Sequence, residues 1–112
     1  MEFTKREREA IIRYLFELIG YQIAENEERA RKQALCSDNF SKNLFGLHAA
    51  DIKKDMDSLR TEHPDYVIMT MSSDKKELVL KMLNDIAYID NDVNNAQVRC
   101  FNITKSFLKK SI

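Results

Sequence analysis

The residues of this sequence that are best placed to bind an ion are Asp90, Asp92 and Asn94. Their D-x-D-x-N spacing matches the first three ligand positions of an EF-hand calcium loop, where side-chain oxygens point at the ion. The rest of the loop does not match, because Asn95 stands where a glycine makes the turn and Phe101 stands where a bidentate glutamate binds. We therefore predict that Asp90 and Asp92 bind a cation weakly at most, and that Asn94 caps the helix that follows.

The other residues of chemical interest form no recognisable catalytic or metal-binding pattern. The two histidines, His48 and His63, show no metal-ligand spacing such as H-x-x-x-H. A phosphate-binding loop needs several glycines, and the chain has only Gly20 and Gly46. We therefore expect no enzymatic activity, no cofactor and no small-molecule substrate.

The predicted ion ligands lie in the turn of a helical hairpin that spans residues 74–108. In its first arm, residues 74–89, apolar residues recur at the spacing of one helix face. Asp74 and Glu77 stand three residues apart just before this apolar run, which is the spacing of a capping box. We predict that the first helix starts at this box and ends at Ile89.

The second arm of the hairpin is predicted to begin at Asn94. Asn94 and Gln97 have the spacing of another capping box. Val93 and Val98 occupy the two positions of a hydrophobic staple around that box. An apolar stripe then continues along the arm to Leu108.

The turn and the start of the second arm resemble the tellurite-resistance TerB-like family, which has Asp-Gly-x-hydrophobic between two helices and then a Glu. Asp90 matches the Asp and Val93 matches the hydrophobic residue. Asn91 replaces the Gly and Gln97 replaces the Glu. The resemblance is strongest over residues 74–108. It implies an all-α bacterial protein tied to stress responses, tellurite resistance and membrane-associated protein complexes. Because Gln97 is uncharged, it does not carry over a cation-binding or acid role.

Length and composition indicate one all-helical domain over residues 1–112. The chain is 44% hydrophobic and 32% charged, which is typical of a sequence that folds. Two glycines and one proline leave few helix breaks. Basic and acidic residues number 18 each, so we expect no general attraction to nucleic acid or to an anionic membrane.

The sequence predicts a cytoplasmic protein without a membrane span. The N-terminal residues mix acids and bases and do not form a signal peptide. Cys36 and Cys100 are far apart and are predicted to be buried, inert thiols. The most apolar run is too short to cross a bilayer, and it contains Arg13 and Glu17.

This apolar run, Ala10–Ala24, is instead predicted to be the central core helix. Thr4 and Glu7 have the spacing of a capping box at its start. The charged segment 25–32 is predicted to be a solvent-facing helix surface. Two alternatives stay open, namely one continuous helix through this segment or a break near Asn26.

The middle of the chain is predicted to form short helices. We interpret Ser37-Asp38-Asn39 as a stop and restart, followed by a helix that ends at Gly46. The next helix is predicted to open at Asp51, or at His48 just before it, and to end at His63-Pro64. The strand-like run 66–71 is predicted to be helical, because an isolated strand is unstable and Pro64 favours a first helical turn.

These elements predict a compact all-α domain of five to seven helices, bundle-like or orthogonal, with the hairpin packed on the central helix. Two weakly similar helix-turn-helix halves are conceivable. The predicted core consists of Ile11, Ile12, Leu15, Phe16, Leu18, Ile19, Ile23, Leu44, Phe45, Ile52, Met56, Leu59, Val79, Met82, Leu83, Ile86, Val98, Phe101 and Phe107.

The predicted function is that of a non-enzymatic helical module that binds a protein partner, with the aspartates of the turn exposed. Candidate partner-surface residues are Tyr14, Tyr21 and Tyr88. The alternative is a small nucleic-acid-binding protein that uses its basic C-terminal helix. That helix carries Arg99, Lys105, Lys109 and Lys110. Zero net charge argues against this alternative, and the sequence does not fix the oligomeric state.

Overall fold

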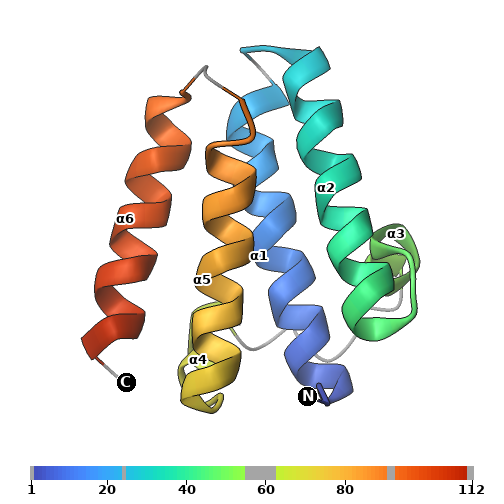
Figure 1. Cartoon of the computed structure of the whole chain (residues 1–112), viewed down its shortest axis with the longest axis vertical. Coiled ribbons are helices and arrows are strands. Elements are labelled where there is room, and N and C mark those ends of the chain that lie inside the picture. Colours follow the sequence, from blue (N-terminus) through green and yellow to red (C-terminus); the bar gives the residue numbers. More distant parts are fainter. Residues whose placement is uncertain (1, 24, 55–62, 91–92, 111–112) are drawn as a thin grey trace.

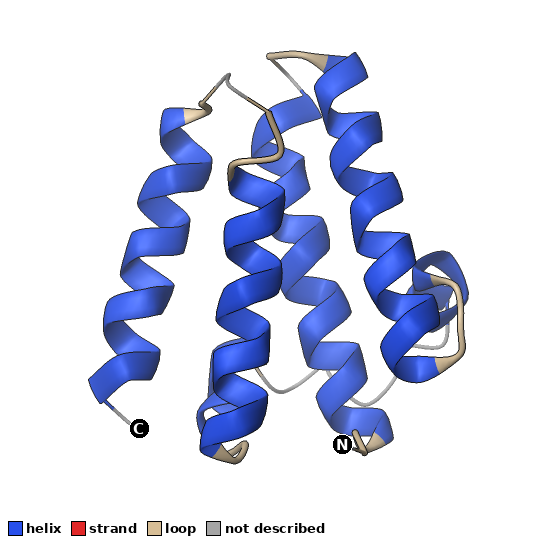
Figure 2. Ribbon diagram, viewed as in Figure 1, coloured by secondary structure: helices blue, strands red, loops and turns tan. Residues whose placement is uncertain are grey.

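The computed structural model describes residues 2–23, 25–54, 63–90 and 93–110, and every regular element in these ranges is an α-helix (Figure 2). The helices are α1 Lys5–Ile23, α2 Glu27–Phe45, α3 Ala49–Lys54, α4 Pro64–Met69, α5 Ser73–Ala87 and α6 Asn95–Lys110. The prediction of an all-α fold with five to seven helices is confirmed. Within the described ranges, none of these helices has the length and apolar character needed to cross a membrane.

The four long helices lie side by side, and the α1–α2 and α5–α6 joints lie at the same end of the molecule (Figure 1). The short helices α3 and α4 lie toward the opposite end, as does the N-terminus. Helix α1 contacts each of the other five helices. The prediction that the apolar N-terminal segment forms the central helix is therefore confirmed.

The capping box predicted at the start of α1 is present. The Thr4 backbone N–H donates to Oε1 of Glu7 at 2.9 Å, and the Glu7 N–H donates to the Thr4 hydroxyl at 3.1 Å. Arg13 and Glu17, one turn apart, form an ion pair at 3.6 Å. Both side chains of this pair are solvent-accessible, so the pair lies on the outer side of the helix.

A break separates α1 from α2, as one of the two alternatives predicted. Helix α1 ends at Ile23, and α2 begins directly after Asn26. The Asn26 side-chain oxygen accepts a hydrogen bond from the Arg29 backbone N–H at 3.1 Å. Asn26 therefore caps the new helix by satisfying one of its unpaired backbone donors.

The stop predicted at Ser37-Asp38-Asn39 is wrong, because α2 continues through these residues to Phe45. Ser37 is buried, and its hydroxyl donates to the Gln33 carbonyl oxygen at 3.0 Å. A serine that bonds the preceding turn in this way is compatible with a helix interior. The predicted end at Gly46 is confirmed, since its φ of 71° gives the left-handed cap that glycine adopts without strain.

The short helices α3 and α4 follow the predicted pattern where the structure describes them. Helix α3 starts at Ala49, just before Asp51, and α4 starts at Pro64 in place of a strand. Ile52 is buried as predicted. The other two core residues predicted for this region, Met56 and Leu59, lie outside the described residues.

Helix α5 begins one residue before the predicted start and ends two residues before the predicted end. The Ser72 hydroxyl accepts from the Lys75 backbone N–H at 3.4 Å, and this serine has the extended backbone of an N-cap. The capping box predicted at Asp74 and Glu77 is therefore wrong, because Ser72 already provides the cap. The helix ends at Ala87.

Most of the predicted core is confirmed. The predicted residues that are buried are Ile11, Ile12, Leu15, Leu18, Ile19, Ile52, Val79, Met82, Leu83, Ile86 and Phe101. Those that are half-buried are Phe16, Leu44, Phe45 and Val98. The prediction is wrong for Ile23 and Phe107, whose exposed fractions are 59% and 40%. Ile23 is the last residue of α1, and Phe107 lies beside the buried stripe of α6 rather than on it.

The structure also buries apolar residues that the predicted core did not include. They are Ala10, Tyr14, Ala30, Ala49, Val67, Ile68, Met71, Ala87 and Leu108. Three of these lie in or just after the short helix α4. That helix contacts α1, so a segment with weak helical periodicity contributes fully buried side chains to the core.

Candidate functional site

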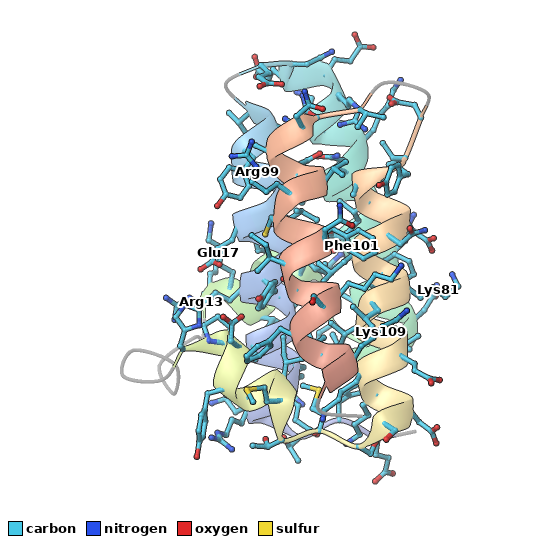
Figure 3. All side chains as sticks on the ribbon, turned by 90° about the vertical axis from the view of Figure 1, so that its left-hand side faces the viewer. Arg13, Glu17, Lys81, Arg99, Phe101 and Lys109 are labelled. Carbon is cyan, nitrogen blue, oxygen red and sulfur yellow. The ribbon has the colours of Figure 1, made fainter. Side chains whose placement is uncertain are left out.

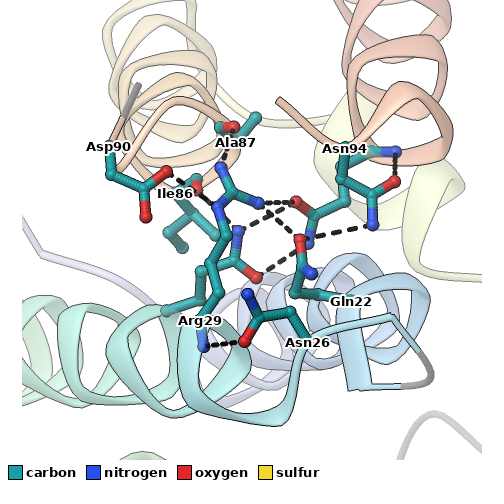
Figure 4. A network of polar contacts seen from close by, with 9 residues as sticks. Gln22, Asn26, Arg29, Ile86, Ala87, Asp90 and Asn94 are labelled. Atoms are coloured by element: carbon teal, nitrogen blue, oxygen red, sulfur yellow. Dashed lines mark hydrogen bonds and ion pairs between the residues drawn. The ribbon is translucent and has the colours of Figure 1, made fainter. Parts of the chain in front are cut away.

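The most buried charged group at the joint end of the molecule is the guanidinium of Arg29, whose residue is only 3% exposed. Its Nε donates to Oδ1 of Asp90 at 2.9 Å, and Nη2 donates to the Ala87 carbonyl oxygen at 3.1 Å. Nη1 donates to Oε1 of Gln97 at 3.1 Å and also to Oε1 of Gln22 (Figure 4). Arg29 is thus an exception to the solvent-facing surface predicted for residues 25–32.

Two buried glutamines extend this arrangement between α2 and α6. The Nε2 atom of Gln33 donates to Oε1 of Gln97 at 2.8 Å, and Nε2 of Gln97 donates to Oε1 of Gln33 at 2.8 Å. Gln33 also donates to the Ile86 carbonyl oxygen, and Gln97 donates to the Leu18 carbonyl oxygen. These amides therefore connect all four long helices.

Asn94 is buried and caps α6 as predicted. Its Oδ1 accepts from the backbone N–H groups of Ala96 at 2.9 Å and Gln97 at 3.1 Å. The reciprocal half of the predicted capping box is wrong, because the Gln97 side chain points into the core and bonds there. Nδ2 of Asn94 donates to the Tyr21 carbonyl oxygen at 3.1 Å, which ties the start of α6 to the end of α1.

We call this set of bonded side chains the joint network, and its members are Gln22, Arg29, Gln33, Asp90, Asn94 and Gln97. The two joints contribute to it from matching positions. Arg29 lies three residues after the cap Asn26, as Gln97 lies three residues after the cap Asn94. Gln22 and Asp90 each lie four residues before their cap. The two joints thus meet through residues at matching positions.

Of the two predicted ion ligands, the structure places only Asp90. Its carboxylate is half-buried and accepts from the guanidinium of Arg29. Asp92 lies outside the described residues. Across the described ranges, no three His, Cys, Asp or Glu side chains gather in a way that could hold a metal ion. Weak cation binding by the turn stays a prediction, and Arg29 already provides a positive charge to Asp90.

A polar hollow opens beside the joint network. It has a volume of about 290 Å³ and is lined by Gln22, Glu25, Asn26, Arg29, Val93 and Asn94. Val93, the predicted outer half of the hydrophobic staple, is exposed at this hollow.

The second candidate site is the outer face of α6, defined by Asn95, Val98, Arg99, Asn102, Ile103, Ser106 and Phe107. These side chains line an open hollow of about 660 Å³. Ile103 is 65% exposed, and Phe107, one turn further on, is also exposed. Figure 3 views this helix from outside, with Arg99 near its start and Lys109 near its end. The face combines exposed apolar side chains with the guanidinium of Arg99.

A groove between α1 and α6 adjoins the outer face of α6 and shares Arg99 and Ile103 with it. Tyr14 lies at this groove and is largely buried. Its hydroxyl bonds to Asp65 and lies 3.1 Å from the Thr104 hydroxyl. Burial, followed by the bond to Asp65, raises the pKa of Tyr14 far above its usual range. Tyr14 is thus a core residue.

The other two tyrosines predicted as partner-surface residues, Tyr21 and Tyr88, are exposed. Tyr21 lines the groove between α1 and α6. The Tyr88 ring packs edge-to-face on Phe101, with ring centroids 6.2 Å apart. Tyr21 therefore enlarges the exposed apolar surface next to Ile103.

The two cysteines are free and half-buried rather than fully buried. Burial raises the pKa of the Cys36 thiol, and the charge of Asp85 adds to the effect. Burial also raises the pKa of the Cys100 thiol, with Glu17 and Asp65 adding to it. Because the thiolate is the reactive form, these shifts favour the predicted inert role.

Comparisons with known proteins add no relative: no family model matches the chain, and no curated protein or solved structure matches it either. The TerB-like resemblance of the turn is neither supported nor contradicted by them.

Proposed function

We propose that this chain is a non-enzymatic helical module that binds a protein partner through the outer face of α6. The observation that supports this proposal is the exposure of Ile103 and Phe107, one turn apart, on a regular helix. Exposed apolar side chains that line one hollow are typical of interaction sites. The polar groups of the joint network, by contrast, bond one another and stabilise the fold.

The TerB-like resemblance suggests a biological setting for this module. Asp90 and Val93 match the family pattern, which favours a bacterial stress-response role such as tellurite resistance. In that setting the module would act by joining protein complexes, with weak cation binding at the turn as a secondary property. A calcium titration that leaves the thermal unfolding temperature of the wild type and of Asp90→Asn unchanged would remove the cation part.

The protein-binding proposal is tested by site-specific photocrosslinking in the organism that makes this chain. A benzophenone amino acid replaces Ile103 in one variant and Leu35 in another, because Leu35 is 63% exposed but lies on α2. We expect a discrete crosslinked protein from position 103 and none from position 35. The proposal fails if neither position gives a product, or if both positions give the same products.

The second candidate function is nucleic-acid binding, which is favoured by the charge of α6. This helix contains Arg99, Lys105 and Lys109 and no acidic residue. Contacts to phosphates release counterions, so duplex DNA binding would weaken steeply as salt rises. The measurement is a titration with duplex DNA at low and moderate salt, with Lys105→Gln and Lys109→Gln combined as the control variant. The absence of binding at low salt would remove this candidate.

A further inference from the structure

The outer face of α6 carries charges of both signs along its border with α1. Arg99 belongs to this face and also lines the groove between α1 and α6, to which Glu17 and Asp65 contribute carboxylates. Within the described residues Arg99 takes part in no ion pair. One cation and two nearby carboxylates suit a partner surface that carries the same groups in the opposite order.

The two described lysines of α6 lie on another side of the helix. Lys105 places its Nζ 5.9 Å from the centre of the Phe101 ring, which packs against Tyr88 at the end of α5. Figure 3 shows Lys109 on this same side, away from Arg99. The exposed apolar pair is therefore not bordered by a row of cations, which argues against a nucleic acid on this face.

Hydrogen bonds fix where the groups of the groove lie along α6. The Tyr14 hydroxyl bonds to the Asp65 carboxylate and lies 3.1 Å from the Thr104 hydroxyl, so Asp65 lies near the level of Thr104. The Tyr21 carbonyl oxygen accepts at 3.1 Å from the side chain that caps α6. Tyr21 also lines the groove together with Ala96, so it lies near the level of the first turn.

We infer that this face binds a second copy of the chain, with the two α6 helices antiparallel across a two-fold axis. This inference rests on the proposed function and names its partner. A two-fold interface uses the same patch twice, so the patch must complement itself. An axis that passes midway between residues 101 and 102 places Arg99 level with Thr104 of the second copy, and so near its Asp65. The geometry of such an axis keeps the α1 sides of both copies on one side of the helix pair.

The same axis also aligns the exposed apolar side chains. It places Phe107 level with Ala96 of the second copy, and so near Tyr21, which is 50% exposed. The two Ile103 side chains would lie roughly 4.5 Å apart along the helix axes, which is three residue rises. One register therefore aligns a charge pair and two apolar contacts, and this convergence favours a second copy of the chain.

Sedimentation equilibrium of the purified full chain over a concentration series tests the association. We expect a reversible dimer. Ile103→Glu places two carboxylates near the axis and should weaken the dimer at least about tenfold. Leu35→Glu is the matched control, because Leu35 is equally exposed but lies on α2, and it should leave the dissociation constant unchanged. Circular dichroism of both variants checks that they remain folded.

Charge exchange tests the register. Arg99→Glu and Asp65→Arg each bring like charges together at both symmetry-related contacts, so each variant alone should dimerise at least about tenfold more weakly than the wild type. In an equimolar mixture opposite charges meet at both contacts, so the two variants should form a heterodimer of near wild-type affinity. Lys109→Glu, on the α5 side of the helix, is the matched control and should leave dimerisation unchanged.

The outcomes separate this inference from the proposed function. A dimer that survives both Ile103→Glu and Arg99→Glu uses another face and overturns the inference. A chain that stays monomeric throughout the series also overturns it. If photocrosslinking from position 103 in the host then captures a different protein, the proposed function stands with that protein as the partner. If position 103 gives no product in the host or in the purified chain, the proposed function fails as well.

Discussion

At the scale of single residues, Arg29 has the largest structural role in the joint network. A buried guanidinium needs both charge compensation and hydrogen-bond acceptors. Asp90 provides the charge, and the carbonyl oxygen of Ala87 with the amides of Gln22 and Gln97 provides acceptors. The planar guanidinium of Arg29 presents its N–H donors in a fixed fork that matches these acceptors. A lysine ammonium would not match them.

Arg29→Met should therefore destabilise the protein by about 3 kcal/mol or more, because it leaves several partner groups without their donor. The measurement is the free energy of unfolding in urea. Arg31→Met is the matched control on the same helix, since Arg31 is exposed and pairs with Glu27, which is itself exposed, one turn away. Its cost should stay below about 0.5 kcal/mol. Equal effects of the two substitutions would contradict the structural role of Arg29.

At the scale of elements, α2 shows why its buried face could not be found from apolar periodicity. Its buried side chains include Arg29, Gln33, Ser37 and Ser41, spaced four residues apart. Polar residues at this spacing are predicted to face solvent unless their partners are known. For Arg29 and Gln33, partners in α5 and α6 lie 53 to 68 residues away, for example Ile86 and Gln97. The regular spacing of four was the signal available in the sequence.

The start of α3 depends on a residue from the interior of α2. The carboxylate of Asp38 accepts from the Ala49 backbone N–H at 2.9 Å and pairs with His48. The Ala49 hydrogen bond, followed by the His48 bond, lowers the pKa of Asp38 below its ordinary value of 3.8. Asp38 therefore fixes α3 from a position that the sequence alone suggested to be a helix end.

This shift predicts a pH dependence of stability. Because the pKa is lower in the folded protein, the unfolded chain binds the proton first as pH falls. The stabilisation by Asp38 should be fully present above pH 3.8 and should be lost as pH falls through the lowered pKa. Asp38→Asn should reduce the free energy of unfolding at pH 7, and its difference from the wild type should shrink in acid. A difference that stays constant between pH 7 and pH 2.5 would contradict this account.

At the scale of the whole molecule, the all-α fold and the central α1 were predictable, because helix caps, apolar stripes and the low glycine and proline content are local signals. The packing of the α1–α2 hairpin against the α5–α6 hairpin was not predictable from the sequence. It depends on amides and a guanidinium that bond across long sequence separations, and Gln97 was interpreted as a local cap. The candidate site was missed for a related reason. Ile103 and Phe107 have apolar side chains, and only the assembled bundle shows that their side of α6 remains exposed.

The reciprocal amide pair of Gln33 and Gln97 should couple the two hairpins energetically. Replacing either one by Met keeps the approximate volume but leaves a buried amide without its partner, at a cost of about 1–3 kcal/mol. The double substitution removes both, so its cost should fall at least about 1 kcal/mol below the sum of the single costs. A double-mutant cycle in urea measures this coupling.

Ser41→Ala provides the control with Gln97→Met, because Ser41 is buried two turns further along α2. That pair should be additive within about 0.5 kcal/mol. Additivity of the two amide substitutions would show that the Gln33–Gln97 pair does not couple the two hairpins.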